Sequence, residues 1–354
     1  MTLLGLKLDE ADRAQWRDEV FRDLRVDDAT RAPLERAMQR SRTAILEARR
    51  TLDDDGRLPD GHDIVAFGSL ARFELTPQSD LDWLVVTSEP SSLDVTPLIE
   101  SLRSKLVDGV TLSEPGDSRL FGETIAVADL VTNIGLQEDT NHTTTRRILF
   151  LEESVSLARP EIHMNALRSV LDAYVKAKDG SDQIPRYLLN DIIRYWRTIA
   201  VDYQAKATQK NPKALRYLKL LIPRKLCYVA SIAPLYLLHR SDTGCDDQLE
   251  YLLDQYSTPA LERLLGLLAH VASGGDEAVR ERCRRVVTAS SRFIESSGRA
   301  EWRATIEADF VGDDRKESEG FGSMRTLGKE LHEDLCGIFH AEPFASFSRE
   351  YMVI

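Results

Sequence analysis

Residues 64–86 of the 354-residue chain read IVAFGSLARFELTPQSDLDWLVV. One apolar run ends at the pair Gly68 and Ser69, and a second begins at Asp80 and Asp82 after ten intervening residues. Short apolar runs bounded by Gly, Pro and Ser are typical of buried strands. Side chains alternate between the faces of a strand, so the two aspartates are expected to point to the same side.

The aspartate pair indicates a metal site. Two carboxylates held side by side repel each other, and a cation between them removes the repulsion. Carboxylate oxygen is a ligand that Mg²⁺ prefers, and this ion commonly arrives with the phosphates of a nucleotide. The Gly68-Ser69 corner can offer backbone N–H groups and a hydroxyl to those phosphates. These residues favour metal-dependent chemistry on a nucleoside triphosphate; the alternative is an acidic turn with no ligand.

The order strand, Gly-Ser, ten residues, D-x-D, strand resembles the signature of the polymerase-β-type nucleotidyltransferase superfamily. The segment 72–79, RFELTPQS, is similar to the branch that contains the PII-protein uridylyltransferases, where Glu-Leu and Pro-x-Ser precede the acids. Residues 139–141 (DTN) and 146–154 (RRILFLEES) resemble the short helical segment that follows the sheet in that branch. The resemblance covers residues 63–154 well and residues 186–230 more loosely.

The resemblance implies an α+β fold, with a small mixed-sheet nucleotidyltransferase core flanked by helices and followed by an all-α domain. We expect an N-terminal helical segment over residues 1–60, the catalytic core over 61–157, and helices over 158–354 that form the other side of a cleft. Apolar spacing predicts an amphipathic helix over 34–52 and a short helix over 69–75. The predicted strands span residues 64–67, 81–87, 110–112 and 124–127.

A basic segment lies in the helical part of the chain. Residues 194–225 hold nine basic side chains against the single acid Asp202. Arg194 and Arg197 are three residues apart and share one helix face. In the superfamily, helices after the sheet supply basic residues to the triphosphate, which makes the following residues candidates for phosphate contact: Arg194, Arg197, Lys219, Arg224 and Lys225. The alternative is a solvated basic surface.

The sequence offers rival candidates for a third carboxylate. The superfamily often places another acid on a neighbouring strand, and Asp129 continues the alternation of Ile125 and Val127. Asp129 is also well placed to cap a helix that starts at Leu130. The rival is Glu114, with Asp117 and Glu123 behind it.

The resemblance implies nucleotidyl transfer. Asp80 and Asp82, with Asp129 as the third ligand, would hold Mg²⁺ (or Mn²⁺) in a two-metal site, with the ions roughly 3.5–4 Å apart. Gly68 and Ser69 would bind the β- or γ-phosphate. The acceptor hydroxyl could belong to a protein, an RNA end or a second nucleotide, and ATP is among the donor nucleotides. If the third acid is missing, the alternative is a weakly active or inactive relative that acts as a regulatory or antitoxin-type binding partner.

Composition limits the other classes of function. The formal net charge of −12 disfavours an extensive nonspecific nucleic-acid surface. The four cysteines, Cys227, Cys245, Cys283 and Cys336, show no paired metal spacing, and we expect a reduced, cytoplasmic setting. No apolar run in the sequence predicts a membrane span. The apolar positions of residues 246–354 suit a packed bundle or a docking face, including that of a homodimer.

Overall fold

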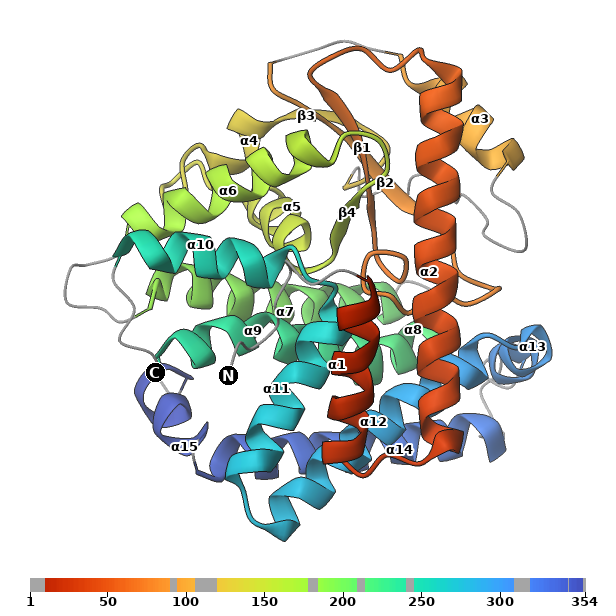
Figure 1. Cartoon of the computed structure of the whole chain (residues 1–354), viewed down its shortest axis with the longest axis vertical. Coiled ribbons are helices and arrows are strands. Elements are labelled where there is room, and N and C mark those ends of the chain that lie inside the picture. Colours follow the sequence, from red (N-terminus) through yellow and green to blue (C-terminus); the bar gives the residue numbers. More distant parts are fainter. Residues whose placement is uncertain are drawn as a thin grey trace.

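The computed structural model describes most of the chain as helices around one small sheet (Figure 1). The described residues are 10–89, 94–105, 120–177, 184–208, 214–239, 245–308, 319–342 and 344–352.

The sheet has four strands in the order β3-β2-β1-β4. Its strands are β1 (His62–Phe67), β2 (Asp82–Thr87), β3 (Thr124–Ala126) and β4 (Ser154–Ser156). Strand β1 pairs antiparallel with β2 and with β4, whereas β2 and β3 are parallel. The sheet is therefore mixed, as expected, and the side chains of β1 and β2 are almost entirely buried.

Helices flank this sheet and continue beyond it. Those up to residue 176 are α1 (Glu10–Asp23), α2 (Asp28–Asp55), α3 (Thr96–Lys105), α4 (Val127–Val131), α5 (Asn141–Glu152) and α6 (Pro160–Lys176). The later helices are α7 (Arg186–Thr208), α8 (Ala214–Lys219), the π-helical η1 (Leu220–Arg224), α9 (Lys225–His239), α10 (Cys245–Tyr256), α11 (Ala260–Gly274), α12 (Glu277–Ser297), α13 (Ala300–Ala308), α14 (Glu319–His340), α15 (Phe344–Phe347) and the π-helical η2 (Ser348–Met352).

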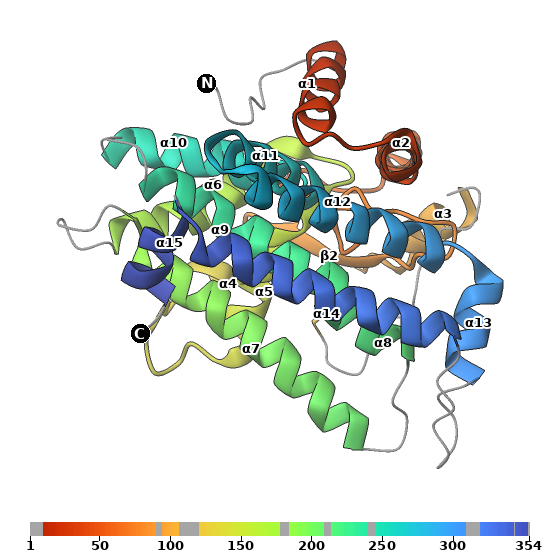
Figure 2. The ribbon, with the colours of Figure 1, turned by 90° about the horizontal axis from the view of Figure 1, so that it is seen from below.

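Helix α2 connects the two parts of the molecule. It packs on α3 beside the sheet and on α12 in the helical part, and it runs along one side of the structure in Figure 1. Asp27 caps its first turn by accepting a hydrogen bond from Thr30 N, and Gly56 ends it with a φ of 65°. Figure 2 shows α12 and α14 passing side by side across the helical part. The helices after the sheet thus pack back against the N-terminal helices.

The segment α8–η1–α9 passes through the helical core. Ala214–His239 is, by length and composition, apolar enough to cross a membrane, with a mean hydropathy of 1.3. In the fold, 72% of the apolar window is buried, as in a core helix. A π-helical turn occurs at η1, which contains Pro223, because proline has no N–H for the regular helical hydrogen bond. This turn brings Lys219 and Arg224 to the same side of the structure as the start of β2.

The fold class expected from the sequence is confirmed, and so are the helix over 34–52 and the strands near 64–67, 81–87 and 124–127. The short helix expected over 69–75 is wrong, because this segment forms consecutive turns in which Phe73 adopts a φ of 64°. Strand β4 was not expected, since its three residues directly follow a helix. The strand predicted over 110–112 lies outside the described residues.

A buried histidine joins β4 to α6. His163 Nε2 lies 2.7 Å from the Ser154 hydroxyl oxygen, and its ring lies 5.1 Å from the Phe150 ring. Burial, helped by nearby Arg49, lowers the pKa of His163 to about 3. The imidazole is therefore neutral in the folded chain across the whole range in which an unfolded histidine becomes charged.

This shift predicts a pH dependence of stability. Between pH 6.5 and 3 the unfolded chain binds one more proton at His163 than the folded chain, so stability falls as the pH falls through this window. The contribution from pH 7 to pH 5 is about 2 kcal/mol. Urea unfolding of the wild type and of His163→Asn at pH 7 and pH 5 gives the change in unfolding free energy for each protein. The difference between these two changes measures the contribution of His163. His332→Asn, at an exposed histidine, should keep the wild-type dependence; equal dependence in all three proteins would contradict the assignment.

Candidate functional site

The pairing of β1 with β2 brings the Gly-Ser corner to the aspartate pair. Phe67, the last residue of β1, pairs with Asp82, the first residue of β2. Gly68 follows with a φ of 72°, a backbone conformation that glycine adopts without strain. A Cβ atom on Gly68 would lie 3.9 Å from Asp82 Oδ2. The two halves of the sequence pattern are thus neighbours in space because of strand register.

The connection between the strands is ordered by its own hydrogen bonds. Arg72 N donates to Gly68 O at 2.9 Å, and Glu74 N donates to Ser69 O at 2.8 Å. A second turn follows, in which Thr76 N donates to the Ser79 hydroxyl at 3.0 Å. This turn leads directly into Asp80, so the local structure of the connection determines where the first acid stands.

A cavity of about 670 Å³, a volume that includes the open solvent at its mouth, lies over these residues. The sheet side supplies Gly68, Ser69, Arg72, Glu74, Thr76, Ser79, Asp80 and Asp82. The helical side supplies Lys219, Pro223, Arg224, Phe293, Ile294, Ser297 and Arg303. The cavity, which we call the acidic-pair cavity, therefore lies between the sheet and the helices α8, η1, α12 and α13.

The electrostatics at the aspartate pair favour a bound cation. Burial raises the pKa of Asp82 to about 6, and the negative charge of Asp80 adds to the effect, whereas Arg224 opposes it. A cation bound between the carboxylates would relieve this repulsion. Mg²⁺ is commonly held by one or two carboxylates together with substrate phosphates and water, so this donor set fits it. Among the described residues, no group of three or more His, Cys, Asp or Glu side chains is arranged to hold a metal ion.

Two basic side chains face Asp80 from the helical side. Burial lowers the pKa values of both Lys219 and Arg303, and attraction by Asp80 opposes the shift in each case. Arg303 is held by two backbone carbonyls, with Nη1 donating to Gln78 O at 2.5 Å and Nε to Ser297 O at 2.6 Å. The cavity thus has an acidic wall and a basic wall.

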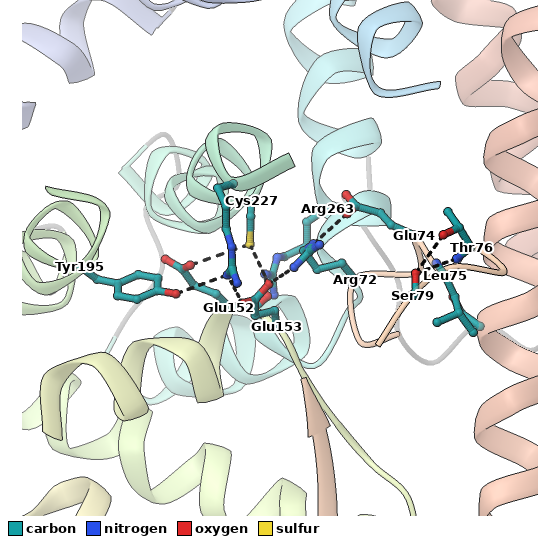
Figure 3. A network of polar contacts seen from close by, with 12 residues as sticks. Arg72, Glu74, Leu75, Thr76, Ser79, Glu152, Glu153, Tyr195, Cys227 and Arg263 are labelled. Carbon is teal, nitrogen blue, oxygen red and sulfur yellow. Dashed lines mark hydrogen bonds and ion pairs between the residues drawn. The ribbon is translucent and has the colours of Figure 1, made fainter. Parts of the chain in front are cut away.

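A buried ion network connects the walls (Figure 3). Glu153, whose side chain is 1% exposed, accepts hydrogen bonds from Arg72 Nη1 and Arg224 Nη1. Arg72 Nε also donates to Glu74 Oε2 at 2.8 Å. Burial alone would raise the pKa of Glu153, but Arg224 and Arg72 hold it below its ordinary value. One carboxylate therefore orients an arginine from each side of the cavity.

The neighbouring Glu152 has a different environment. Burial and the charge of Glu153 raise the pKa of Glu152 to about 8, so this carboxyl is mostly protonated at neutral pH. Its backbone carbonyl accepts a hydrogen bond of 2.5 Å from Arg263 Nη2 of α11 (Figure 3). The end of α5 is thereby attached to the later helices through the backbone carbonyl of Glu152 and the side chain of Glu153, the residue that follows the helix.

The structure brings several predicted site residues together and leaves others apart. Gly68, Ser69, Asp80, Asp82 and Lys219 all line the acidic-pair cavity, and Arg224 joins them.

Arg194 and Arg197 do not line this cavity. Arg194 donates to Asn141 Oδ1 at 2.6 Å, and Arg197 is exposed. The buried face of α7 carries Tyr195 instead, whose hydroxyl lies 3.5 Å from Arg224 Nη1. Helical periodicity showed correctly that the two arginines share a face, but that face does not turn toward the acids. Lys225 likewise is not part of the lining.

Asp129 is placed away from the aspartate pair. It lies in the first turn of α4, where its Oδ2 accepts a hydrogen bond of 3.0 Å from Ala126 N. Ala126 pairs with Thr87, at the opposite end of β2 from Asp82 and roughly 17 Å along the strand. The expectation that Asp129 is a metal ligand is therefore corrected: it caps a helix.

Of the rival acids, only Glu123 lies among the described residues. Glu114 and Asp117 lie outside the described residues. Glu123 accepts a hydrogen bond of 2.5 Å from Arg146 and is 42% exposed.

Sequence reasoning missed the contributions of α12 and α13 to the cavity. Phe293, Ile294, Ser297 and Arg303 lie more than 200 residues beyond the aspartates, and nothing in their local sequence signals the contact. The role of Glu153 was also missed. Its only signal is its position at the end of the segment RRILFLEES, next to a second glutamate.

The ion network makes a stability prediction. Glu153→Gln leaves Arg224 without its carboxylate partner and leaves Arg72 with Glu74 alone, and removal of one member of a buried pair costs about 3–5 kcal/mol. Glu123→Gln, in a partly exposed pair, should cost about 1 kcal/mol or less. Denaturant unfolding of both variants measures the difference; equal losses would contradict a structural role for Glu153.

Comparison with known families agrees with this geometry. Residues 45–117 match the family described as the nucleotidyltransferase domain, and the match includes Gly68, Ser69, Asp80 and Asp82. No curated protein matches the chain. Neither comparison tests the resemblance to the uridylyltransferase branch. The chain carries a nucleotidyltransferase domain, consistent with a polymerase-β-type core.

Proposed function

We propose that this protein transfers a nucleoside monophosphate from a nucleoside triphosphate to a hydroxyl acceptor, with release of pyrophosphate and a proton. The observation that carries the proposal is the acidic-pair cavity, where Asp80 and Asp82 face Lys219 and Arg303. In the reaction, a bond forms between the acceptor oxygen and the α-phosphorus. The bond between the α-phosphorus and the oxygen that bridges it to the β-phosphorus breaks.

Asp80 and Asp82 are the groups that would hold Mg²⁺ in this site. When bound, the ion would supply Lewis-acid stabilisation of charge on the reacting phosphate. The raised pKa of Asp82 supports this role, because burial and the charge of Asp80 both destabilise the carboxylate when no cation is present. The number of ions and the use of Mn²⁺ belong to the proposal.

The basic wall suits the triphosphate. Lys219, Arg224 and Arg303 lie in a partly buried setting, where charge–charge attraction is stronger than in water. They would offset the negative charge that builds on the departing pyrophosphate. Ser69 lines the same cavity and can donate its hydroxyl to a β- or γ-phosphate oxygen.

The proposal also covers the acceptor, the donor nucleotide, the cellular location and the oligomeric state. The acceptor is a protein, an RNA end or a second nucleotide, and ATP is among the donors. We place the reaction in the cytoplasm, and homodimer formation through the C-terminal helices belongs to the proposal as well.

A second function is a nucleotide-binding partner that performs no transfer. The absence of a three-carboxylate group among the described residues favours it, because the superfamily often uses a third acid to hold the metal that activates the acceptor. Such a protein would bind a triphosphate in the same cavity and act as a regulatory or antitoxin-type partner.

The central variant is Asp82→Asn. It removes a metal ligand but preserves the shape of the side chain, so transfer should fall by about a thousandfold or more. Folding stability should stay the same or rise, since the repulsion from Asp80 is relieved.

The measurement is pyrophosphate release and label transfer from each labelled triphosphate in the presence of Mg²⁺. Wild-type transfer that Asp82→Asn loses supports the enzyme. Magnesium-dependent triphosphate binding without pyrophosphate release from any of the four nucleotides, tested with protein, RNA and nucleotide acceptors, supports the binding partner. No binding at all would overturn both functions.

A matched pair of basic residues tests the phosphate wall. Lys219→Gln should weaken triphosphate binding about tenfold, which corresponds to about 1.4 kcal/mol. Arg216→Gln, one turn earlier on α8 but exposed, should bind like the wild type. Isothermal titration calorimetry measures both; equal affinities for the two variants would exclude Lys219 from the site.

A further inference from the structure

A second cavity, of about 360 Å³, lies on the other side of the connection between β1 and β2. It is an open cavity bordered by α1, α2, β4 and the segment before α11. Its lining residues are Arg13, Arg42, Ile45, Leu46, Arg49, Ala71, Phe73, Ser154, Val155, Ser257 and Pro259. The lining combines three arginines with an apolar surface and includes no acidic side chain.

The three arginines are held by residues that do not line the cavity. Arg13 and Arg42 pair with Glu262 Oε atoms at 3.7 and 2.9 Å, and this carboxylate is 3% exposed. Arg49 Nη2 donates to Ser156 O at 3.1 Å, whereas its Nε is buried with no hydrogen-bond partner among the described residues. Arg49 has no ion pair among the described residues, and a carboxylate or sulfonate group in the cavity would supply its counter-charge.

The lining also has an apolar part, which would suit a molecule larger than a simple anion. Ile45 and Leu46 of α2 face the cavity with Pro259, and Leu46 is 52% exposed. Phe73 adds an aromatic ring, over which the Arg42 guanidinium lies at 5.4 Å from the ring centroid. An exposed leucine beside arginines and an aromatic ring suits a molecule with an apolar body and a negative group.

We propose that this second cavity binds a small organic anion with an apolar body. The negative group contacts Arg49, with Arg13 and Arg42 adding attraction, and the apolar body covers Ile45, Leu46 and Pro259.

The second cavity and the acidic-pair cavity are lined by neighbouring residues of the same segments, so a ligand in one can affect binding in the other. Phe73 lines the second cavity, while its chain neighbours Arg72 and Glu74 line the first. Ser154 lines the second cavity and directly follows Glu153, which holds Arg72. Phe73 adopts a φ of 64°, a conformation that bulky residues keep only where their surroundings impose it. A ligand against Phe73 and Ser154 therefore changes triphosphate affinity, an effect that rests on the proposed function.

The test uses anilinonaphthalene sulfonate, an aromatic anion whose fluorescence rises in an apolar site. The full chain should bind one equivalent. Arg49→Gln removes the charge, and Leu46→Glu places a negative charge at the exposed rim, so each should weaken binding about tenfold. Arg50→Gln, the exposed neighbour on α2, is the matched control and should bind like the wild type. Circular dichroism establishes that each variant is folded; should Arg49→Gln not fold, Leu46→Glu decides.

The outcomes separate the two proposals. Equal dye affinity in the wild type and the folded cavity variants, or no saturable binding, overturns the second site whatever the triphosphate does. Triphosphate affinity is then measured with and without saturating dye. A change supports coupling between the cavities, and an unchanged affinity overturns it. Absence of triphosphate binding without dye overturns the proposed function, while the dye titration still decides the second cavity.

Discussion

The arrangement of the acidic-pair cavity depends on one buried carboxylate. Glu153 stands at the end of α5, just before β4, and holds Arg72 from the strand connection and Arg224 from η1. Ionised carboxylates are stable in such a place only when cations accompany them. Without Glu153, the like charges of Arg72 and Arg224 would repel each other, and only Arg72 would keep a carboxylate partner, Glu74. Glu153 therefore joins the sheet part to the helical part through ion pairs beside the cavity.

The same reasoning explains why the two walls of the cavity differ. Asp80 and Asp82 come from a strand start that is already tied to β1 by register, so their mutual repulsion is built into the sheet. Lys219 and Arg303 come from helices that approach from the other side. A triphosphate with Mg²⁺ matches both walls at once, since it carries a cation for the acids and anions for the bases.

The site residues that could be predicted from the sequence are those that a local pattern marks. Gly68, Ser69, Asp80 and Asp82 were identified because strand alternation and the Gly-Ser break are local properties, and Lys219 because the basic segment is dense. Arg194 and Arg197 share a helix face, but periodicity does not say which neighbour that face meets. The sequence left two roles open for Asp129, a helix cap or a metal ligand. The parallel pairing of β2 with β3 decided between these roles. The contacts made by Arg303 and Glu153 depend on packing between distant segments, which the sequence pattern does not encode.

The most direct test of this account is a crystal structure of the protein with Mg²⁺ and a non-hydrolysable triphosphate analogue. The account predicts that the metal lies between the carboxylates of Asp80 and Asp82. The β- and γ-phosphates should then contact Lys219 and Arg303. An analogue bound elsewhere, or one that approaches the aspartates without a metal ion between them, would contradict it.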